Sequence, residues 1–518
     1  MYGLYVFGAT FLLALYRLII WPVAKYFIDH KGLRKYPNMT FWSGISDVPF
    51  MLEAAKGYRC GRLAELHKVH PVIRIGPESL SYGDLKAIKD IYGHGTKCLK
   101  GDFYAVTAGT HFHVADVADK KEHQRKRRVL SSAYAIKHLE GWEFKVVDKV
   151  ERLFKQFDAR CTSPIEDKCA PNPIDFNVEF RTWVNFFTME AIVDIGLSNI
   201  LGFLDRGDDE TIAETLSGTL HSASYRDSIH SLLTAQSHLV WAYGWYKSLW
   251  KWVPRVSARY RQLVRKGKGF EGIVMHQTRR RLKQYQAGES MDDFFEAMME
   301  TNEGVPHQLP FGEIFAELSV MMNAGSVTTA IAIQNVVYLL LRHPSELRKL
   351  RLEIDGVVDP DEDIIPYDKL KDLPYLRACL DESMRLFPPT SFGLPRKTPP
   401  GGCVVLGDFL PGNTHVSISS YVAHRDEKIF PDAETFRPER WLGEQGKQLQ
   451  PYFITFSAGA RGCIGRNISY LEQTVLVASL IHRYEMALLS PEWELERVEH
   501  FNLVPEKMPV KLWRRVIE

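Results

Sequence analysis

One cysteine of this chain lies in a segment whose residue types and spacing suit a metal-bound thiolate. Cys463 follows Gly459 and Arg461, and it precedes a run whose apolar residues recur with helical spacing. The dipole at a helix N-terminus favours a thiolate over a thiol. Gly459 and Gly465 carry no side chain, so a flat cofactor can approach the backbone, and Arg461 suits an anionic group such as a carboxylate. A thiolate presented in this way can bind iron, including haem iron.

The segment from Phe456 to Gly465 reads FSAGARGCIG and resembles the haem-binding loop of the cytochrome P-450 family, written FxxGxRxCxG. All five fixed positions match. A buried, inert cysteine in a glycine-rich turn is the alternative, but it does not account for five matching positions. The resemblance implies haem b (iron protoporphyrin) as the cofactor, with Cys463 as the ligand of the iron and Arg461 as a partner of a propionate.

Two further segments match the same family. Glu382 and Arg385 lie three apart in a predicted helix over 373–386, so they share one face. Alone, such a pair indicates only an exposed ion pair. The segment over 436–441 reads FRPERW and resembles the PERF-type segment of the family, with tryptophan at the last position. The resemblance implies that Glu382, Arg385 and Arg440 form a buried triad that supports the cysteine loop.

Further basic residues stand where the family holds the haem propionates. His123 and Arg127 occupy the positions of the family's WxxxR pattern, with histidine in place of tryptophan, and Arg396 matches another propionate site. The rest of the basic run over 120–128 is expected to form an exposed helix face that attracts an acidic electron donor. The outward-facing members are expected to be Lys121, Arg125 and Arg128.

A long helix without proline is predicted over 311–343, and its middle reads AGSVTT from residue 324. Ala324 and Thr328 share one face, and Gly325 is expected to leave open space beside them. One interpretation is a helix-packing notch in which the Thr328 hydroxyl bonds back to a carbonyl. The segment also resembles the oxygen-binding groove of the family, written AGx(D/E)T, which implies that Thr328 is catalytic.

The sequence departs from the family at Val327, where an acid usually stands and helps to relay protons. The Thr328 hydroxyl and ordered water then remain as the relay. This departure keeps open an isomerase or dehydratase that shares the haem loop and needs no external electron donor. A non-catalytic haem-binding protein for sensing or electron transfer is the other alternative.

Composition indicates a globular protein in a reducing compartment. The chain has 518 residues, of which 45% are hydrophobic and 25% charged. The net charge of +2 argues against a nucleic-acid-binding protein. Seven scattered cysteines, an odd number, do not form a disulfide framework.

The N-terminal segment predicts a membrane anchor. Residues 1–24 carry one charge, Arg17, and approach the ~20 residues needed to cross a bilayer. The lysines and arginines follow this stretch, which predicts a single-pass helix in the endoplasmic reticulum membrane with the catalytic part in the cytosol. A cleaved signal peptide would need a basic start, and a buried core helix is the other alternative. We predict an anchor over 1–24, a basic and proline-containing hinge over 25–40 and a haem-thiolate catalytic domain over 41–518.

The remaining patterns predict a mainly α fold with small β-sheets, which is the cytochrome P-450 fold with an N-terminal transmembrane helix. Strands are expected over 71–77 and 79–82, and near the end of the chain over 401–420 and 508–516. Residues 119–350 are mostly helical in pattern. A surface loop is expected over 161–173, which is rich in proline, serine, aspartate and asparagine.

No dinucleotide-binding fingerprint is apparent in the sequence. The family resemblance therefore implies an NADPH-cytochrome P-450 reductase as the partner and a monooxygenase reaction that inserts one atom of O₂ into a small organic substrate. Similarity to fungal members indicates secondary-metabolite biosynthesis or aromatic metabolism, with no role for nucleic acid. The segments expected to line the substrate pocket are apolar in character: Phe103 to Val114, His221 to Trp252, Met321 to Ala324 and Thr390 to Leu394.

Overall fold

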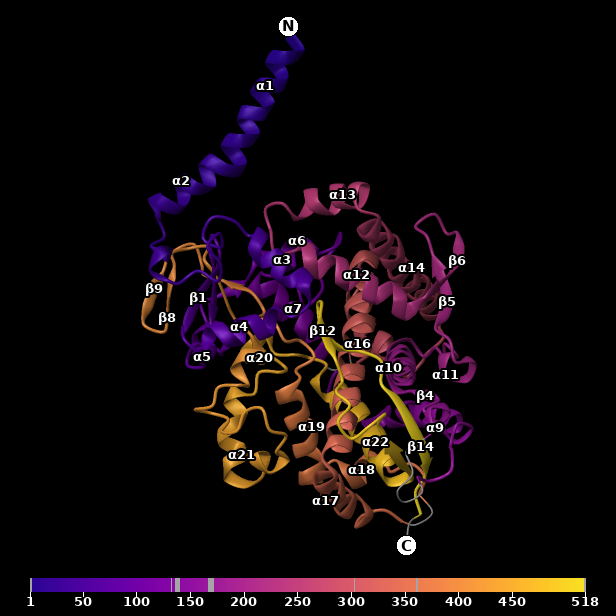
Figure 1. The fold of residues 1–518 in the computed structure, drawn as a ribbon. Coiled ribbons are helices and arrows are strands. Elements are labelled where there is room, and N and C mark those ends of the chain that lie inside the picture. The colour runs from indigo at the N-terminus through magenta and orange to yellow at the C-terminus, as the bar shows by residue number, and fades with distance from the viewer. Residues whose placement is uncertain are drawn as a thin grey trace.

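The structure is a computed structural model that describes residues 2–131, 133–135, 140–165, 172–301, 303–359 and 362–516. Figure 1 shows a mainly helical body with small sheets, which confirms the predicted fold class. Helix α16, of 32 residues, runs through the middle of this body and is buried along most of its length. At ~1.5 Å per residue it is about 48 Å long, enough to cross the domain. Part of the predicted surface loop, including Cys169, lies outside the described residues.

The helices carry most of the described chain. They are α1 (Tyr2–Leu15), α2 (Trp21–Ile28), α3 (Val48–Lys56), α4 (Arg59–His67), α5 (Ala87–Tyr92), α6 (Asp102–Thr107), α7 (Lys120–Ser131), α9 (Glu143–Asp158), α10 (Phe180–Leu197), α11 (Phe203–Arg206), α12 (Tyr225–Leu239), α13 (Tyr246–Val256), α14 (Ala258–Gln286), α15 (Phe294–Met299), α16 (Phe311–Arg342), α17 (Pro344–Asp355), α18 (Tyr367–Leu370), α19 (Pro374–Leu386), α20 (Ser420–Ala423), α21 (Gly443–Leu449) and α22 (Arg466–Arg483).

The strands form one five-stranded sheet and several smaller ones. They are β1 (Val72–Gly76), β2 (Ser79–Tyr82), β3 (Leu99–Lys100), β4 (Val178–Glu179), β5 (Glu210–Glu214), β6 (Leu220–Ser224), β7 (Arg396–Lys397), β8 (Cys403–Val405), β9 (Asp408–Leu410), β10 (His415–Ile418), β11 (Tyr484–Ala487), β12 (Arg497–Glu499), β13 (Leu503–Pro505) and β14 (Pro509–Arg514). The largest sheet has the order β1-β2-β10-β7-β3, in which only β2 and β10 are parallel. It joins the N-terminal strands to the segment that follows α19.

An apolar helix projects from the body at the N-terminus (Figure 1). Helices α1 and α2 continue into each other through a π-helical turn (Tyr16–Ile20). The stretch Phe7–Ile28 is long and apolar enough to cross a membrane, and none of it is buried in the protein. Helix α16 passes the same test of length and composition, but it is mostly buried and belongs to the core. At the base of the projecting helix, Lys25 and Lys31 pair with Glu78 at 2.6 and 2.8 Å.

Candidate functional site

The Cys463 loop is a tight turn that leads into helix α22. The Cys463 N–H donates to the Phe456 carbonyl oxygen at 2.9 Å, which closes the loop. Helix α22 begins three residues later, at Arg466. Gly459 has a φ of +66°, and a Cβ atom there would lie 2.2 Å from the Tyr92 carbonyl oxygen. Only glycine fits this position, because a side chain would strain the backbone and clash with the neighbouring chain.

The Cys463 thiol is exposed to solvent on one side and enclosed by protein on the others. Burial raises the pKa of this thiol above its ordinary value, whereas hydrogen bonds from the Gly465 and Arg466 N–H groups and the charge of Arg127 lower it. Near neutral pH the sulfur therefore keeps its proton unless a bound metal ion displaces it. An accessible sulfur with N–H donors beside it has the chemistry of a metal ligand.

A buried network centred on the Glu382 carboxylate lies behind this loop. Arg385 donates to it from Nε at 2.8 Å and from Nη2 at 2.9 Å, and Arg440 donates from Nε at 3.0 Å. The indole N–H of Trp441 and the backbone N–H of Arg437 complete the set at 2.9 and 3.0 Å. The side chains of the two arginines and the glutamate are fully buried. The network joins α19 to the turn that carries Arg440.

His424 connects this network to the segment that enters the cysteine loop. Arg385 donates from Nη1 to the His424 carbonyl oxygen at 2.7 Å, and the Ile454 N–H donates to His424 Nε2 at 2.9 Å. Burial and the charge of Arg385 lower the pKa of His424 to about 3, so the ring is neutral and Nε2 can accept. Thr455 adds a hydrogen bond to the Met384 carbonyl oxygen at 3.1 Å. The sequence did not indicate these links.

Three arginines gather at the loop: Arg461 within it, Arg127 from α7 and Arg396 from β7. Arg127 of α7 donates to the Gly462 carbonyl oxygen at 2.8 Å, and Arg396 and Arg461 also bond only uncharged oxygens. Within the described residues none of the three forms an ion pair. Burial and the charges of Arg396 and Arg127 lower the pKa of Arg461 to about 10. Burial and the charges of Arg461 and Arg127 lower the pKa of His123 to about 4. The structure thus brings together the three arginines and the histidine that the sequence placed at the propionates, with the His123 ring neutral.

Lys100 is a fifth member of this group, which the sequence did not indicate. Strand β3 pairs with β7 so that Lys100 stands opposite Arg396. Its Nζ donates to the Ala115 carbonyl oxygen and lies 3.8 Å from the centre of the Tyr104 ring. Burial and the charges of Arg396 and Arg461 lower the pKa of Lys100 well below its ordinary value. Only the tertiary pairing of two-residue strands places this lysine at the site.

These residues fit a haem. The arginines repel one another, and in the described part of the chain none of them has an ion-pair partner, so a ligand with two carboxylates, such as haem with its propionates, would relieve the repulsion. The accessible Cys463 sulfur provides the donor that haem iron takes in thiolate proteins. The site therefore has both the metal ligand and the anion contacts that a haem requires.

The predicted groove on α16 differs from expectation in its packing. The Thr328 hydroxyl donates to the Ala324 carbonyl oxygen at 2.7 Å, as the packing-notch interpretation expects. Ala324 is nevertheless exposed and Thr328 half-buried within a largely buried helix, so this face borders accessible space. The expectation that Gly325 leaves open space is wrong. A Cβ atom there would lie 2.5 Å from Ile192, so the glycine serves the close packing of α10 against α16.

Val327→Asp is expected to destabilise the protein and not to restore a proton relay. Val327 is 1% exposed and lies in the main apolar core. Placing a carboxyl group in an apolar core is costly, so we expect the free energy of unfolding to fall by about 3 kcal/mol. Urea denaturation measures this change, with Val327→Ala as the control for lost packing alone. An aspartate variant as stable as the wild type would show that this position faces water.

Three of the four segments expected to line a substrate pocket meet in an aromatic cluster, whereas Met321, in the segment expected on α16, packs in the main core. The Phe103 ring centre lies 5.3 Å from Trp241 and 5.9 Å from Phe392, and the latter two lie 5.4 Å apart. Phe501, which the sequence did not single out, joins the cluster at 6.0 Å from Phe103. His221, at the start of one expected segment, lies instead on the exposed strand β6.

The basic face of α7 is exposed as predicted, but it is partly neutralised. Lys121, Arg125 and Arg128 are exposed. Arg125 forms ion pairs with Glu122, at 2.8 Å, and with Glu313. Lys121 and Arg128 therefore carry most of the positive charge that this face offers to a partner.

Comparisons with known proteins agree with this geometry. The sequence model of a family described as "Cytochrome P450" matches residues 63–512. The chain is similar to a benzoate 4-monooxygenase, bphA, of Aspergillus niger, with 29% identity over 99% of this chain and 98% of the relative. It is also similar to a cytochrome P450 monooxygenase of Aspergillus terreus, with 31% identity over 82% of this chain and 84% of the relative. A tryprostatin B 6-hydroxylase of Aspergillus fumigatus is 27% identical over 99% of this chain and 84% of the relative.

Proposed function

The chain belongs to the cytochrome P450 family and is a monooxygenase, and we propose that it inserts one atom of O₂ into a largely apolar small organic substrate. We propose further that the electrons come from NADPH through a separate NADPH-cytochrome P-450 reductase. The family implies a haem cofactor, which we propose is haem b. The observation that best supports the proposal is the accessible Cys463 thiol beside three arginines that form no ion pair with any residue the structure describes.

In this proposal each part of the site has one task. Cys463 is the ligand of the haem iron, and the propionates bind Arg127, Arg396 and Arg461, with His123 as a further donor. The buried triad of Glu382, Arg385 and Arg440 would hold the cysteine loop in place. When bound, the haem supplies the activation of O₂, and a thiolate ligand favours cleavage of the O–O bond.

Thr328 is the catalytic side chain that we propose for proton delivery. Its hydroxyl lies one turn from the exposed Ala324 on α16, whereas Val327 has no proton to give and is buried in the core. In this structure the hydroxyl donates to Ala324. Rotation about χ1 would free it to order a water molecule and pass a proton toward the accessible face.

Thr328→Ala is expected to uncouple the enzyme. Losing one polar contact in a dry active site typically lowers the rate by about 10²–10³, so electrons from NADPH should appear as hydrogen peroxide while haem content stays at the wild-type level. The measurement is product formed per NADPH consumed with a competent reductase. Thr328→Ser, which keeps the hydroxyl, is the matched control and should remain coupled. Full coupling in the alanine variant would show that the groove does not lie on α16 at this position.

The aromatic cluster around Phe103, Trp241 and Phe392 favours a substrate that is mostly apolar and flat. Two of the similar proteins are named for benzoate and for tryprostatin B. We propose that the substrate is an aromatic compound or a secondary metabolite.

Turnover with purified reductase tests the proposed function. Product should form only with NADPH, O₂ and reductase present together. Product formed without reductase or O₂ would support an isomerase or dehydratase with the same haem loop, which Val327 keeps open. Haem binding with no product under any condition would support the non-catalytic alternative. Charge reversal at Lys121 and Arg128 should slow only the reductase-dependent step, because complementary charge speeds encounter.

We propose that the N-terminal helix anchors the protein as a single span in the endoplasmic reticulum membrane, with the catalytic domain in the cytosol. The division into an anchor over 1–24, a hinge over 25–40 and a catalytic domain over 41–518 belongs to the same proposal. Its support is the exposed apolar helix Phe7–Ile28 followed by lysines.

Full-length protein is expected to stay with membranes during alkaline carbonate extraction, because about 20 apolar residues cross the bilayer core. A variant without residues 2–28 should be released, at least in large part. Protease added to sealed microsomes should digest the catalytic domain. Protection of that domain would mean that the orientation is reversed.

A further inference from the structure

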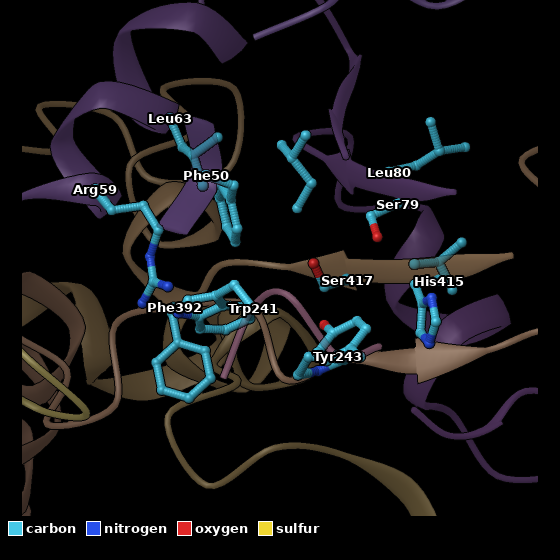
Figure 2. Close-up of a pocket in the computed structure, with 14 residues that line it drawn as sticks. Phe50, Arg59, Leu63, Ser79, Leu80, Trp241, Tyr243, Phe392, His415 and Ser417 are labelled. Carbon is cyan, nitrogen blue, oxygen red and sulfur yellow. The ribbon is translucent and has the colours of Figure 1, made fainter. Parts of the chain in front are cut away.

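A small pocket lies between helices α3 and α4 and the five-stranded sheet (Figure 2). It is separate from the cluster of arginines, although Pro395, which borders it, directly precedes Arg396. Figure 2 shows Arg59 reaching toward Phe392 and Trp241 on one side, with Ser79, Ser417 and His415 on the other. The pocket therefore has aromatic walls and a few polar groups, which is the composition of a small-molecule site.

Arg59 is the buried charge of this pocket. It is 1% exposed, and its guanidinium carbon lies 4.3 Å from the Trp241 ring centre and 5.1 Å from that of Phe392. Nε and Nη2 donate to one oxygen of Glu499, at 3.2 and 2.6 Å. The other Glu499 oxygen accepts the Cys60 N–H at 2.6 Å. Within the described residues, Nη1 is buried and has no hydrogen-bond partner.

A buried N–H group without an acceptor is unfavourable, so such a group in a native structure points to a missing partner. Glu499 already neutralises the charge of Arg59, and the pair as a whole is neutral. A second carboxylate beside it would be repelled by Glu499. The free donor therefore suits an uncharged oxygen acceptor, such as the oxygen of a ketone, ester or ether.

The same aromatic rings connect this pocket to the proposed substrate region. Trp241 and Phe392 line the pocket, and both also contact Phe103 in the aromatic cluster. We propose that Arg59 recognises a neutral oxygen acceptor on a flat aromatic substrate at this pocket. This inference rests on the proposed function, whose substrate class it narrows.

The pocket is narrow in this structure and has room for about one water molecule. Trp241 and Tyr243, which form one wall, belong to a segment of turns over 240–245 between α12 and α13. Trp241 is buried and packs in the aromatic cluster, whereas Tyr243 is only half-buried, so Tyr243 is the part of this wall that moves at lower cost. Displacement of this wall would admit a ring while the fixed Arg59–Glu499 pair held its oxygen.

The test compares two probes of similar shape, acetophenone, which has an acceptor oxygen, and isopropylbenzene, which has none. Binding is measured by titration calorimetry on full-length, haem-loaded protein in one detergent. Wild type should bind acetophenone about tenfold more tightly than isopropylbenzene. The double variant Arg59→Met with Glu499→Gln removes donor and charge together, so that no buried charge is left unpaired. It should lose the tenfold preference and keep its affinity for isopropylbenzene.

A second variant tests the role of Glu499. Glu499→Gln alone leaves the Arg59 charge unneutralised, so affinity for benzoate should rise about tenfold over wild type. The proposal is overturned if the double variant still binds acetophenone more tightly than isopropylbenzene, or if the wild type binds both equally. It is also overturned if Glu499→Gln leaves the affinity for benzoate unchanged. Reductase-dependent turnover is measured on the same preparations. Turnover without the expected binding preferences contradicts only the role of Arg59, whereas absence of turnover contradicts the proposed function.

Discussion

Glu382→Gln should abolish stable haem incorporation. The carboxylate accepts hydrogen bonds from two fully buried arginines, and its loss leaves both guanidinium charges without an anion. Breaking a buried pair in this way typically costs about 3–5 kcal/mol, a large part of a usual stability of 5–15 kcal/mol. The cysteine loop would also lose the support that reaches it through His424. Urea denaturation and haem bound per protein chain measure the two effects.

Trp441→Phe is the matched control for this change. It removes a single neutral donor to Glu382 at 2.9 Å and keeps an aromatic ring that packs against Phe453. We expect it to cost about 1 kcal/mol and to retain haem. If the Glu382→Gln variant unfolded at the same urea concentration as the wild type and bound as much haem per chain, the network would not support the loop.

Cys463→Ala should eliminate monooxygenase turnover. Among the described residues near the arginine cluster, this sulfur is the accessible soft donor. Without it a bound haem would lack its thiolate ligand and the O–O bond cleavage that the ligand favours. Product formation with reductase and NADPH should fall to background, and haem content should fall as well. Cys161→Ala, at a half-buried cysteine, is the control and should behave as the wild type. Wild-type turnover by Cys463→Ala would require another ligand.

The features that could be predicted from the sequence are those encoded locally. The turn around Gly459, the helix that follows Cys463 and the shared face of Glu382 and Arg385 depend on neighbours within a few residues. Long stretches of one pattern, such as α16 and the N-terminal apolar helix, were predicted for the same reason. These turns and helices are stabilised by residues close together in the chain, so their positions can be predicted from the sequence.

The features that could not be predicted depend on contacts between distant segments. Lys100 reaches the site only because β3 pairs with β7 in one register, nearly 300 residues away. His424 matters because it lies between α19 and the loop, which no spacing indicates. Gly325 was assigned the wrong role because its partner, Ile192, lies on another helix whose position is set by the core.

The absorption spectrum of the reduced, carbon monoxide-bound full-length protein tests the central claim most directly, because it reports which protein group would bind the haem iron. If Cys463 is a thiolate on haem iron, the wild type and Cys161→Ala should show the red-shifted band of a thiolate-ligated haem, and Cys463→Ala should lose it. A wild-type band at the position of histidine-ligated haem, or a red-shifted band that persists in Cys463→Ala, would contradict the claim.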